Sequence, residues 1–412
     1  MTKRVSRKSG PSDSQRRGKS KSALKVLFFS PHALADSSSG AARSVSTLLG
    51  ELVGLGHQCM AVTGSVLDAA NTLFDRVLAV PPAHEFKVSA ANATMPIRKV
   101  MLRGVAHIIM NFSGTRVGDV LAVEELALQK LFLDCFAEFQ PDVVLSYGGF
   151  TSNYFAGVYA MSQGRKSALY IGSGSYQRPE HFIHANMILT VSQSLCAQLD
   201  KVTQLPKLTI RPVVDKAAVV CRERKPEFIT FINPLPAKGL KLAAALVLEC
   251  QKRGRPYKFL FVEGRGTRET MRRVCPEIER LPTLSVARNT ADIRQVFERT
   301  AIVLYPSVWY EAAGRVPLEA NANGIPVLAS NIGGIPEMLD GAGYLFDPPE
   351  SCQKNWEAAV PSAYVERWLD VLDRLHNDPA ELKDAERRAC EADGRYDATK
   401  FAQDFVDFVA AG

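Results

Sequence analysis

The residues best suited to chemistry lie within one short stretch of the chain, residues 304–320, which read LYPSVWYEAAGRVPLEA. Its apolar start predicts a strand that ends in a loop holding Glu311, after which Gly314 precedes a helix carrying Glu319. Pro317 suits the first turn of that helix, where its missing N–H donor costs nothing. Small alanine and glycine residues in the loop allow a phosphate or a sugar to approach the backbone closely. The stretch therefore predicts a ligand-binding loop between a strand and a helix.

A nucleotide with a diphosphate is the ligand that these residue types favour. The free N–H groups at the start of a helix attract a negatively charged diphosphate. A carboxylate such as Glu319 can accept hydrogen bonds from both hydroxyls of a ribose. Either Glu311 or Glu319 alone would be interpreted as a solvated surface acid, because glutamate is mostly exposed. The two acids together with the glycine loop favour a binding site.

Several common catalytic and metal-binding motifs are absent from the sequence. It contains neither the G-x-S-x-G pattern of a nucleophile elbow nor the G-x-x-x-x-G-K-[ST] phosphate loop. Gly264-Arg265-Gly266 begins like a dinucleotide fingerprint but lacks its third glycine, so an ordinary strand-to-helix turn is the alternative. His181 and His184 are three residues apart, but zinc needs three or four ligands and no third one lies nearby. We therefore expect neither a metal site nor a resident cofactor.

Two series of short apolar runs predict the strands that position these residues. The first series covers residues 25–30, 58–63, 143–145, 168–171 and 187–191, and the second covers 228–232, 259–262, 301–305 and 326–329. Glycine-containing loops and amphipathic helices between the runs predict doubly wound α/β domains. A single eight-fold barrel fits less well, because the strand spacing restarts near residue 228.

This pattern predicts two domains and a terminal helix. We expect an N-terminal domain over residues 25–215, a linker within 211–225 and a C-terminal domain over 226–390. Apolar residues at helical spacing between Phe401 and Val409 predict that residues 395–412 form a helix packed back on the domains.

The composition places the basic charge outside the folded part. The 412 residues carry a formal net charge of +7, but the first 25 residues hold nine basic side chains and one acidic one. Residues 1–24 are polar and serine-rich, so we expect a disordered basic tail, with weak attachment to an anionic membrane surface as the sharper alternative. The nearly neutral remainder argues against a nucleic-acid partner.

The sequence also bears on the compartment. The chain has no apolar run of about 18 residues and no secretory signal pattern. Its eight cysteines are scattered without a C-x-x-C pair, and we expect them to be buried, reduced thiols. These observations predict a cytoplasmic protein, with peripheral attachment at the inner membrane surface left open.

Taken with its neighbours, the central stretch resembles glycosyltransferase family 4. The resemblance is carried by the spacing Glu-x7-Glu, the embedded Gly-Arg-Val, and the following Gly-Ile-Pro-Val-Leu-Ala-Ser and Gly-Gly-Ile-Pro-Glu segments. It includes PAKGL at residues 236–240, VSQS at 191–194 and SGAA at 39–42. It extends from about Lys25 to Asp347 and is more specific in the second half. It implies the GT-B fold, in which two Rossmann-like domains face a central cleft.

The resemblance also implies an activity and roles for individual residues. Members are retaining enzymes that move a sugar from a nucleotide sugar to an acceptor hydroxyl, here on a glycan, a lipid-linked molecule or a small molecule. Lys238 would neutralise the donor diphosphate, and Glu311 would contact the transferred sugar. Glu319 would hold the ribose. The remaining residues would bring the backbone close to the sugar and the phosphates: Gly40, Gly314, Arg315 and Val316.

Two departures from the family pattern leave alternatives open. Members usually have an arginine five residues before the lysine, where this chain has Asn233, so Arg265 or another basic residue would have to supply that charge. Many members also have a histidine near the reacting centre, where this chain has Tyr147. A GT-B relative of different activity, such as an epimerase or a phosphorylase, is one alternative. A catalytically weakened homologue that only binds a nucleotide sugar or a partner is the other.

Overall fold

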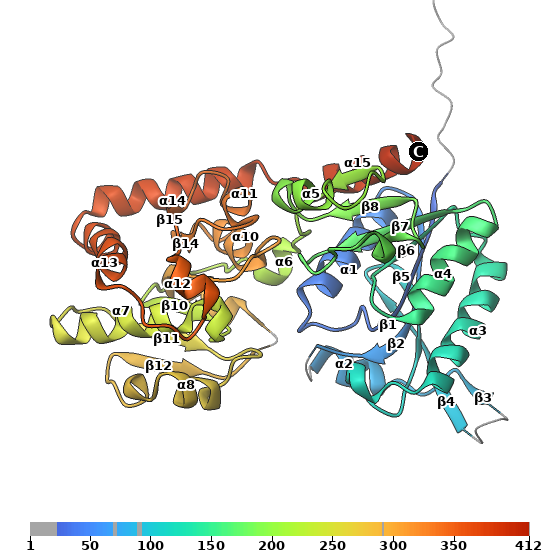
Figure 1. Cartoon of the computed structure of the whole chain (residues 1–412), viewed down its shortest axis with the longest axis horizontal. Helices are drawn as coiled ribbons and strands as arrows, with labels where there is room; N and C mark the ends of the chain where they lie inside the picture. The colour runs from blue at the N-terminus through green and yellow to red at the C-terminus, as the bar shows by residue number, and fades with distance from the viewer. Residues whose placement is uncertain (1–22, 69–71, 89–92, 291, 412) are drawn as a thin grey trace, which may run out of the picture.

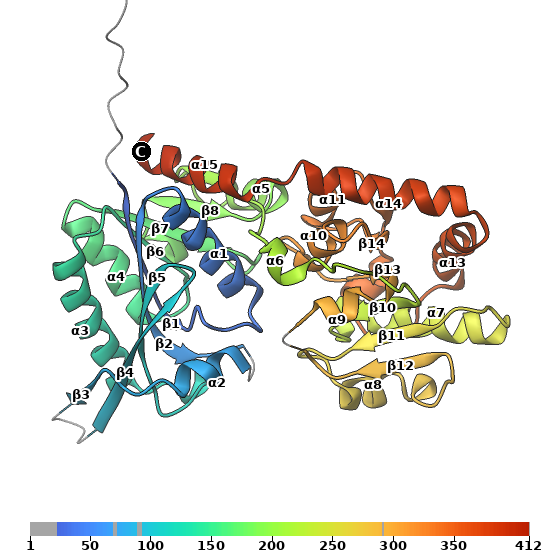
Figure 2. The same ribbon diagram turned by 180° about the vertical axis from the view of Figure 1, so that it is seen from behind.

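The chain folds into two α/β domains that lie side by side (Figures 1 and 2). The computed structural model describes residues 23–68, 72–88, 93–290 and 292–411. The predicted α/β architecture with two domains is confirmed. Of the predicted basic tail at residues 1–24, residues 1–22 lie outside the described residues.

The N-terminal domain is built on a nine-stranded sheet, within the described residues, of order β3-β4-β5-β2-β1-β6-β7-β8-β9. Its strands are β1 (Lys25–His32), β2 (Gln58–Val66), β3 (His84–Val88), β4 (Ala93–Leu102), β5 (Val105–Met110), β6 (Val143–Ser146), β7 (Lys166–Ile171), β8 (Met187–Thr190) and β9 (Lys207–Thr209). In the order of the sheet, β5, β2, β1, β6, β7, β8 and β9 run parallel to one another, whereas β4 pairs antiparallel with both β3 and β5. The sequence prediction missed this hairpin.

The C-terminal domain is built on a parallel sheet of order β12-β11-β10-β13-β14-β15. Its strands are β10 (Phe228–Ile232), β11 (Phe259–Val262), β12 (Leu284–Ala287), β13 (Thr300–Tyr305), β14 (Val327–Ser330) and β15 (Tyr344–Phe346). β10 and β11 have the bounds that their apolar runs predict, because a strand buried on both faces is apolar throughout.

Helices cover both sheets, and the last one returns to the first domain. They are α1 (Gly40–Gly54), α2 (Thr72–Leu78), α3 (Ala122–Phe139), α4 (Thr151–Ser162), α5 (Gln193–Leu199), α6 (Lys216–Val219), α7 (Leu240–Lys252), α8 (Arg268–Val274), α9 (Arg294–Phe297), α10 (Arg315–Asn321), α11 (Ile335–Leu339), α12 (Glu350–Lys354), α13 (Ser362–Asn377), α14 (Pro379–Gly394) and α15 (Ala398–Ala411). α15 packs against α1 (Figure 2) and buries Phe405 and Val409 in the same core as β1. α6 lies in the stretch where we expect the linker.

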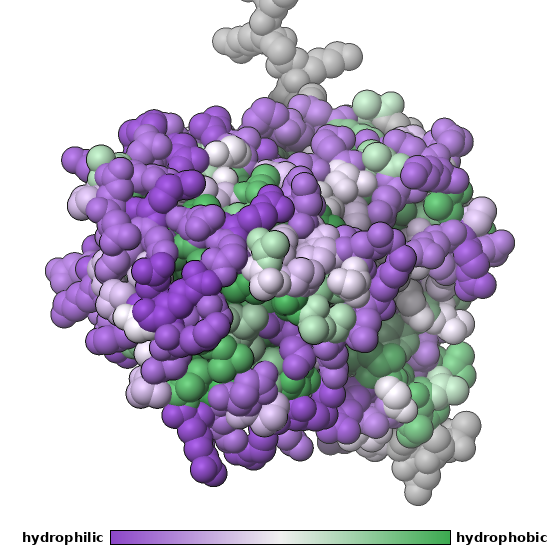
Figure 3. All heavy atoms as spheres, turned by 60° about the vertical axis from the view of Figure 1, so that its left-hand side comes forward, coloured by the Kyte–Doolittle hydropathy of each residue, from purple (hydrophilic) through white to green (hydrophobic). Residues whose placement is uncertain are grey.

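Two further features of the protein are the character of its surface and the state of its cysteines. On the face drawn in Figure 3, hydrophilic side chains predominate and hydrophobic groups lie between them. No helix in the described part of the chain is both long and apolar enough to cross a membrane. All eight cysteines are free, but the expectation that they are buried is wrong for Cys390, which is exposed, and for Cys196 and Cys221, which are only partly buried.

The strand order places two loop clusters where ligands bind in such sheets. The connections change direction between β10 and β13 in the second sheet and between β1 and β6 in the first. In open α/β sheets, ligands bind beyond the carboxyl ends of the strands at such switch points. The loops after β10, β13 and β14, and those after β1 and β6, are therefore where the site must be sought.

Candidate active site

Lys238 and Glu311 form an ion pair at the switch point of the C-terminal domain. Lys238 ends a short 3-10 helix (Pro236–Lys238) after β10, and Glu311 lies in the loop after the neighbouring strand β13. The Lys238 Nζ donates to Glu311 Oε1, and Ser307 Oγ donates to the same oxygen at 2.8 Å. The side chains of Lys238 and Glu311 are 15% and 7% exposed, so the pair is largely shielded from water.

Two glycines allow this close arrangement. Gly239 has φ +87°, and a Cβ there would lie 1.9 Å from the carbonyl oxygen of Pro306. Gly333, in the loop after β14, has φ +59°, and a Cβ there would lie 2.0 Å from the carbonyl oxygen of Glu311. Only glycine fits a positive φ in so little space. The backbone on both sides of the ion pair is therefore fixed by residues that carry no side chain.

Aromatic rings border the lysine. The Lys238 ammonium lies 5.8 Å from the ring centroid of Tyr305 and 5.5 Å from that of Trp309, within cation–π range. Burial, the charge of Glu311 and a hydrogen bond to Glu311 raise the pKa of Tyr305 well above its usual value. Tyr305 is therefore a neutral donor. Trp309 is 38% exposed, so this side of the lysine is open to a ligand.

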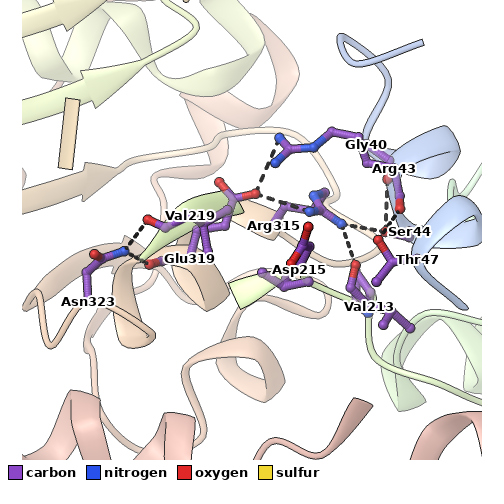
Figure 4. Close-up of polar contacts among 12 residues, drawn as sticks. Gly40, Arg43, Ser44, Thr47, Val213, Asp215, Val219, Arg315, Glu319 and Asn323 are labelled. Carbon is purple, nitrogen blue, oxygen red and sulfur yellow. Dashed lines mark hydrogen bonds and ion pairs between the residues drawn. The ribbon is translucent and has the colours of Figure 1, made fainter. Parts of the chain in front are cut away.

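A second cluster forms around Glu319 where the two domains meet (Figure 4). Glu319 lies on α10, and its carboxylate is 3% exposed. Its Oε1 lies 3.3 Å from Nη2 of Arg315 on the same helix and 3.5 Å from Nη1 of Arg43. Arg43 belongs to α1 of the N-terminal domain, so one buried carboxylate pairs with a cation from each domain.

Arg315 also joins the domains through its side chain. Its Nη1 donates to Ser44 Oγ and to the carbonyl oxygen of Val213, both at 2.8 Å. Burial lowers the pKa of Arg315, while the charge of Glu319 opposes that shift, and a guanidinium remains protonated at neutral pH. A Cβ at Gly40 would lie 3.3 Å from Arg315 Cδ, so α1 begins directly against this side chain.

Of the other predicted site residues, Asn233 directly follows β10 and Arg265 lies in the turn after β11. Asn233 Oδ1 accepts a hydrogen bond from the N–H of Gly266 at 2.8 Å and thereby holds the turn at Gly264-Arg265-Gly266. Arg265 is exposed. Among the described residues, no ion pair or hydrogen bond links Arg265 to Lys238 or Glu311. The structure brings together Lys238 with Glu311, and Gly40 with Arg315 and Glu319, but not Arg265 with either group.

On the N-terminal side, Tyr147 follows β6 and packs among aromatic rings. Its ring centroid lies 5.0 Å from that of Phe28, 6.0 Å from Tyr170 and 6.3 Å from His32. Burial raises the pKa of Tyr147 well above its usual value, and neighbouring tyrosines and acids add to the shift. The residue at the position where the family often has histidine is therefore neutral and cannot accept a proton at neutral pH.

His181 and His184, the histidines that lie three residues apart, both pack against tyrosine rings. His184 packs on Tyr154 with a centroid distance of 4.1 Å, and burial lowers the pKa of His184 to about 4. His181 packs edge-on against Tyr176. Within the described residues, no group of three or more His, Cys, Asp or Glu side chains could hold a metal ion.

Further contacts hold α11 and the loop after β13 against the N-terminal domain. Both carboxylate oxygens of Glu337 accept backbone hydrogen bonds of 2.7 Å, from Gln193 and Ser194 at the start of α5. Ser194 Oγ lies 3.0 Å from the hydroxyl of Tyr310, and Ser192 Oγ donates to the carbonyl oxygen of Ala312. The serine segment identified from the sequence thus contacts the site loop.

Sequence reasoning missed the interdomain role of Arg43 and assigned Arg315 only a backbone role. Arg43 lies three residues after Gly40, next to the SGAA segment, and that position was the available signal. Its partner Glu319 is separated from it by 276 residues, and no local pattern encodes that pairing.

Comparisons with known proteins agree with this geometry. Residues 216–363 match the family model described as glycosyl transferases group 1. An alpha-1,3/1,6-mannosyltransferase, alg-2, from Neurospora crassa is 32% identical over 139 residues, which cover 32% of this chain and 26% of that protein. The chain thus spans about a quarter of the length of this curated relative.

Solved structures match over nearly the whole chain. A glycosyltransferase from Rickettsia africae has a TM-score of 0.66 at 16% identity and covers 95% of this chain and 98% of its own. HepE from Anabaena, solved with UDP and glucose, has a TM-score of 0.65 at 14% identity, with 94% and 100% covered. The catalytic domain of starch synthase IV from Arabidopsis thaliana, bound to ADP and acarbose, has 0.68 at 12% identity, with 95% and 99% covered.

At these identities the structural matches establish the fold, which is GT-B. Residues 216–363 are similar to the group 1 glycosyl transferases, and this match together with the GT-B fold supports a transferase enzyme.

Proposed function

We propose that this protein transfers a sugar from a nucleoside-diphosphate sugar to an acceptor hydroxyl and retains the anomeric configuration. The observation that carries the proposal is the shielded Lys238–Glu311 pair beside Glu319, at the switch point of the sheet within the segment that matches the family model. These groups offer one cation and two carboxylates where a nucleotide sugar needs a phosphate ligand, a sugar ligand and a ribose ligand.

The donor is inferred from the chemistry of these groups and from the relatives. An ammonium carries three N–H donors, so Lys238 can bind phosphate oxygens while it keeps its bond to Glu311. A carboxylate offers about four acceptor positions, so Glu311 can accept from a sugar hydroxyl in addition to Lys238, Ser307 and Tyr305. HepE holds UDP, starch synthase IV holds ADP, and the curated relative is a mannosyltransferase, which favours a hexose on a nucleoside diphosphate.

The reaction develops charge at two places. The bond between the anomeric carbon and the diphosphate breaks, so negative charge grows on the leaving oxygen and positive charge on the carbon. Lys238 and the first backbone N–H groups of α10 stabilise the leaving diphosphate without a metal. The departing phosphate oxygen then takes the proton of the acceptor hydroxyl, which attacks on the same face.

Tyr147 supports this route for the proton. A phenol is neutral at pH 7 and burial raises the pKa of Tyr147 further, so Tyr147 does not compete with the phosphate oxygen as a base. No pair of hydrolase-type carboxylates is required either. The contacts of both domains around Glu319 would exclude the water that otherwise hydrolyses the donor.

For the acceptor we propose a sugar-containing or lipid-linked molecule that binds on the N-terminal domain. The basic residues of the tail suit a reaction near an anionic membrane surface, at about 1 kcal/mol for each Lys or Arg. Vesicles containing anionic lipid should bind the full chain more strongly than a variant without residues 1–22. Equal binding of the two would remove the membrane part of the proposal.

Retention can be tested without knowing the acceptor. When the purified chain slowly hydrolyses an α-linked nucleotide sugar, proton NMR should detect the α-anomer of the free sugar first. Appearance of the β-anomer first would contradict retention. Tight donor binding with no release of sugar, with or without a mixture of acceptors, would favour the homologue that only binds.

A further inference from the structure

Arg43 is the cation that reaches from the N-terminal domain to the ribose-binding carboxylate. It lies on the first turn of α1, after the loop that follows β1, at the switch point of its sheet. Its Nη1 is 3.5 Å from Glu319 Oε1, and Figure 4 shows its guanidinium directed across the interface at that oxygen. The roles implied by the family resemblance do not include Arg43.

The two arginines at Glu319 are held very differently. Arg315 is 12% exposed and has two further hydrogen bonds, to Ser44 and Val213. The Arg43 side chain is 31% exposed, and within the described residues its guanidinium makes this one ion pair and no hydrogen bond. Arg43 can therefore move to another partner by giving up only its 3.5 Å ion pair, whereas Arg315 would also lose two hydrogen bonds.

A nucleotide brings both the competitor and the new partner. Both guanidiniums contact Oε1 of Glu319, so a ribose hydroxyl that donates to this oxygen takes an acceptor position that they now use. The diphosphate adds negative charge close by, and Asn233 contributes no cation there. The planar fork of a guanidinium matches phosphate oxygens in a bidentate way, better than its present single contact with a carboxylate.

We propose that Arg43 is a phosphate-binding residue for the donor, which pairs with Glu319 in the empty site and transfers to the diphosphate when ribose occupies Glu319. This inference rests on the proposed function, because it requires a nucleoside diphosphate in the site. It assigns to the N-terminal domain the arginine charge that position 233 lacks.

The test compares affinities for a nucleoside diphosphate and for its nucleoside, measured by calorimetry on the full chain. In Arg43→Ala the diphosphate affinity should fall about tenfold or more, the range for a lost charge-assisted hydrogen bond. Nucleoside affinity should stay the same or rise, because Glu319 loses a competitor. Arg43→Lys should retain part of the diphosphate affinity through its charge.

Arg165→Ala is the matched control. Arg165 is 34% exposed and lies 3.7 Å from Asp142, which matches the exposure and ion-pair distance of Arg43, although Asp142 is itself 44% exposed and Arg165 also donates to Gln140. Arg165 directly precedes β7 and therefore lies at the amino ends of the strands, away from the loops of the site. This variant should bind both ligands as the unaltered chain does.

Two results would overturn the inference. One is a diphosphate affinity of Arg43→Ala within twofold of the unaltered chain. The other is an equal loss of nucleoside and diphosphate affinity, which would make Arg43 a residue that only holds the domains together. If the unaltered chain binds no nucleoside diphosphate, the proposed function itself fails, and that outcome is distinct from both.

Discussion

Substitution of Gly333 by alanine should inactivate the site without touching a chemical group. The Gly333→Ala Cβ would lie 2.0 Å from the carbonyl oxygen of Glu311, whereas real Cβ contacts are at least 3.0 Å. The Glu311 backbone must therefore move by about 1 Å, and such a misplacement costs about 100-fold in rate. Alanine at φ +59° adds about 1–2 kcal/mol of backbone strain.

Gly341→Ala separates the strain from the displacement. Gly341 has φ +84°, but no described atom lies within 4 Å of the Cβ that alanine would add. Backbone strain should cost both variants about 1–2 kcal/mol of stability in urea unfolding, and Gly333→Ala should lose more because its Cβ must also displace Glu311. Only Gly333→Ala should lose about 100-fold in the initial rate of nucleoside diphosphate release from a donor sugar.

The opposite result would be a folded Gly333→Ala variant whose rate of nucleoside diphosphate release stays within threefold of that of Gly341→Ala. In that case the position of Glu311 would not matter for the reaction.

Three further predictions follow from the contacts at and beside the site. Lys238→Ala should lower donor turnover by about 100- to 1000-fold, the loss expected for a group that stabilises developing charge, and Lys238→Arg should recover part of it; unchanged turnover would remove Lys238 from the mechanism. Glu337→Gln should lower the free energy of unfolding by about 2 kcal/mol in urea titrations, because its carboxylate accepts two backbone N–H groups of α5, and an unaltered midpoint would contradict that. Burial lowers the pKa of His107 to about 4, so between about pH 6.5 and pH 4 the unfolded chain binds a proton that the folded chain does not. Stability should therefore fall as the pH falls through this window, and His107→Phe should reduce the loss between pH 7 and pH 4.5 by about 2 kcal/mol in urea unfolding followed by circular dichroism; an identical loss in both chains would show that His107 does not titrate as described.

The sequence predicts those strands and loops that are determined by residues close to one another in the chain. The apolar runs of β10 and β11 give their bounds directly, because strands buried on both faces admit few polar residues. The loop after β13 can also be predicted from the sequence, because Gly314 marks the end of the loop and Pro317 favours the first turn of α10.

The antiparallel pair β3 and β4 was not predicted. β4 reads ATMPIRKVML, which mixes charges and a proline with apolar residues, as an edge pair with one covered face does. Its position depends on pairing with β5, which no short window reveals.

The site itself was predicted as a set of residues but not as a set of pairs. Lys238 and Glu311 are 73 residues apart and meet only because β10 and β13 are neighbours. The position of Arg43 at Glu319 depends on how the two domains dock, which is a property of both surfaces.

A thermal-shift panel with UDP, GDP, ADP, CDP and dTDP, on the purified chain and on Glu319→Ala, would test directly whether this site binds a nucleoside diphosphate. A ligand at 100 times its Kd adds about 2.7 kcal/mol of stability. We expect the nucleoside diphosphate with one of these bases to stabilise the unaltered chain selectively, and we expect Glu319→Ala to lose most of this shift. Absence of a shift with every nucleotide, or an equal shift in Glu319→Ala, would contradict this expectation.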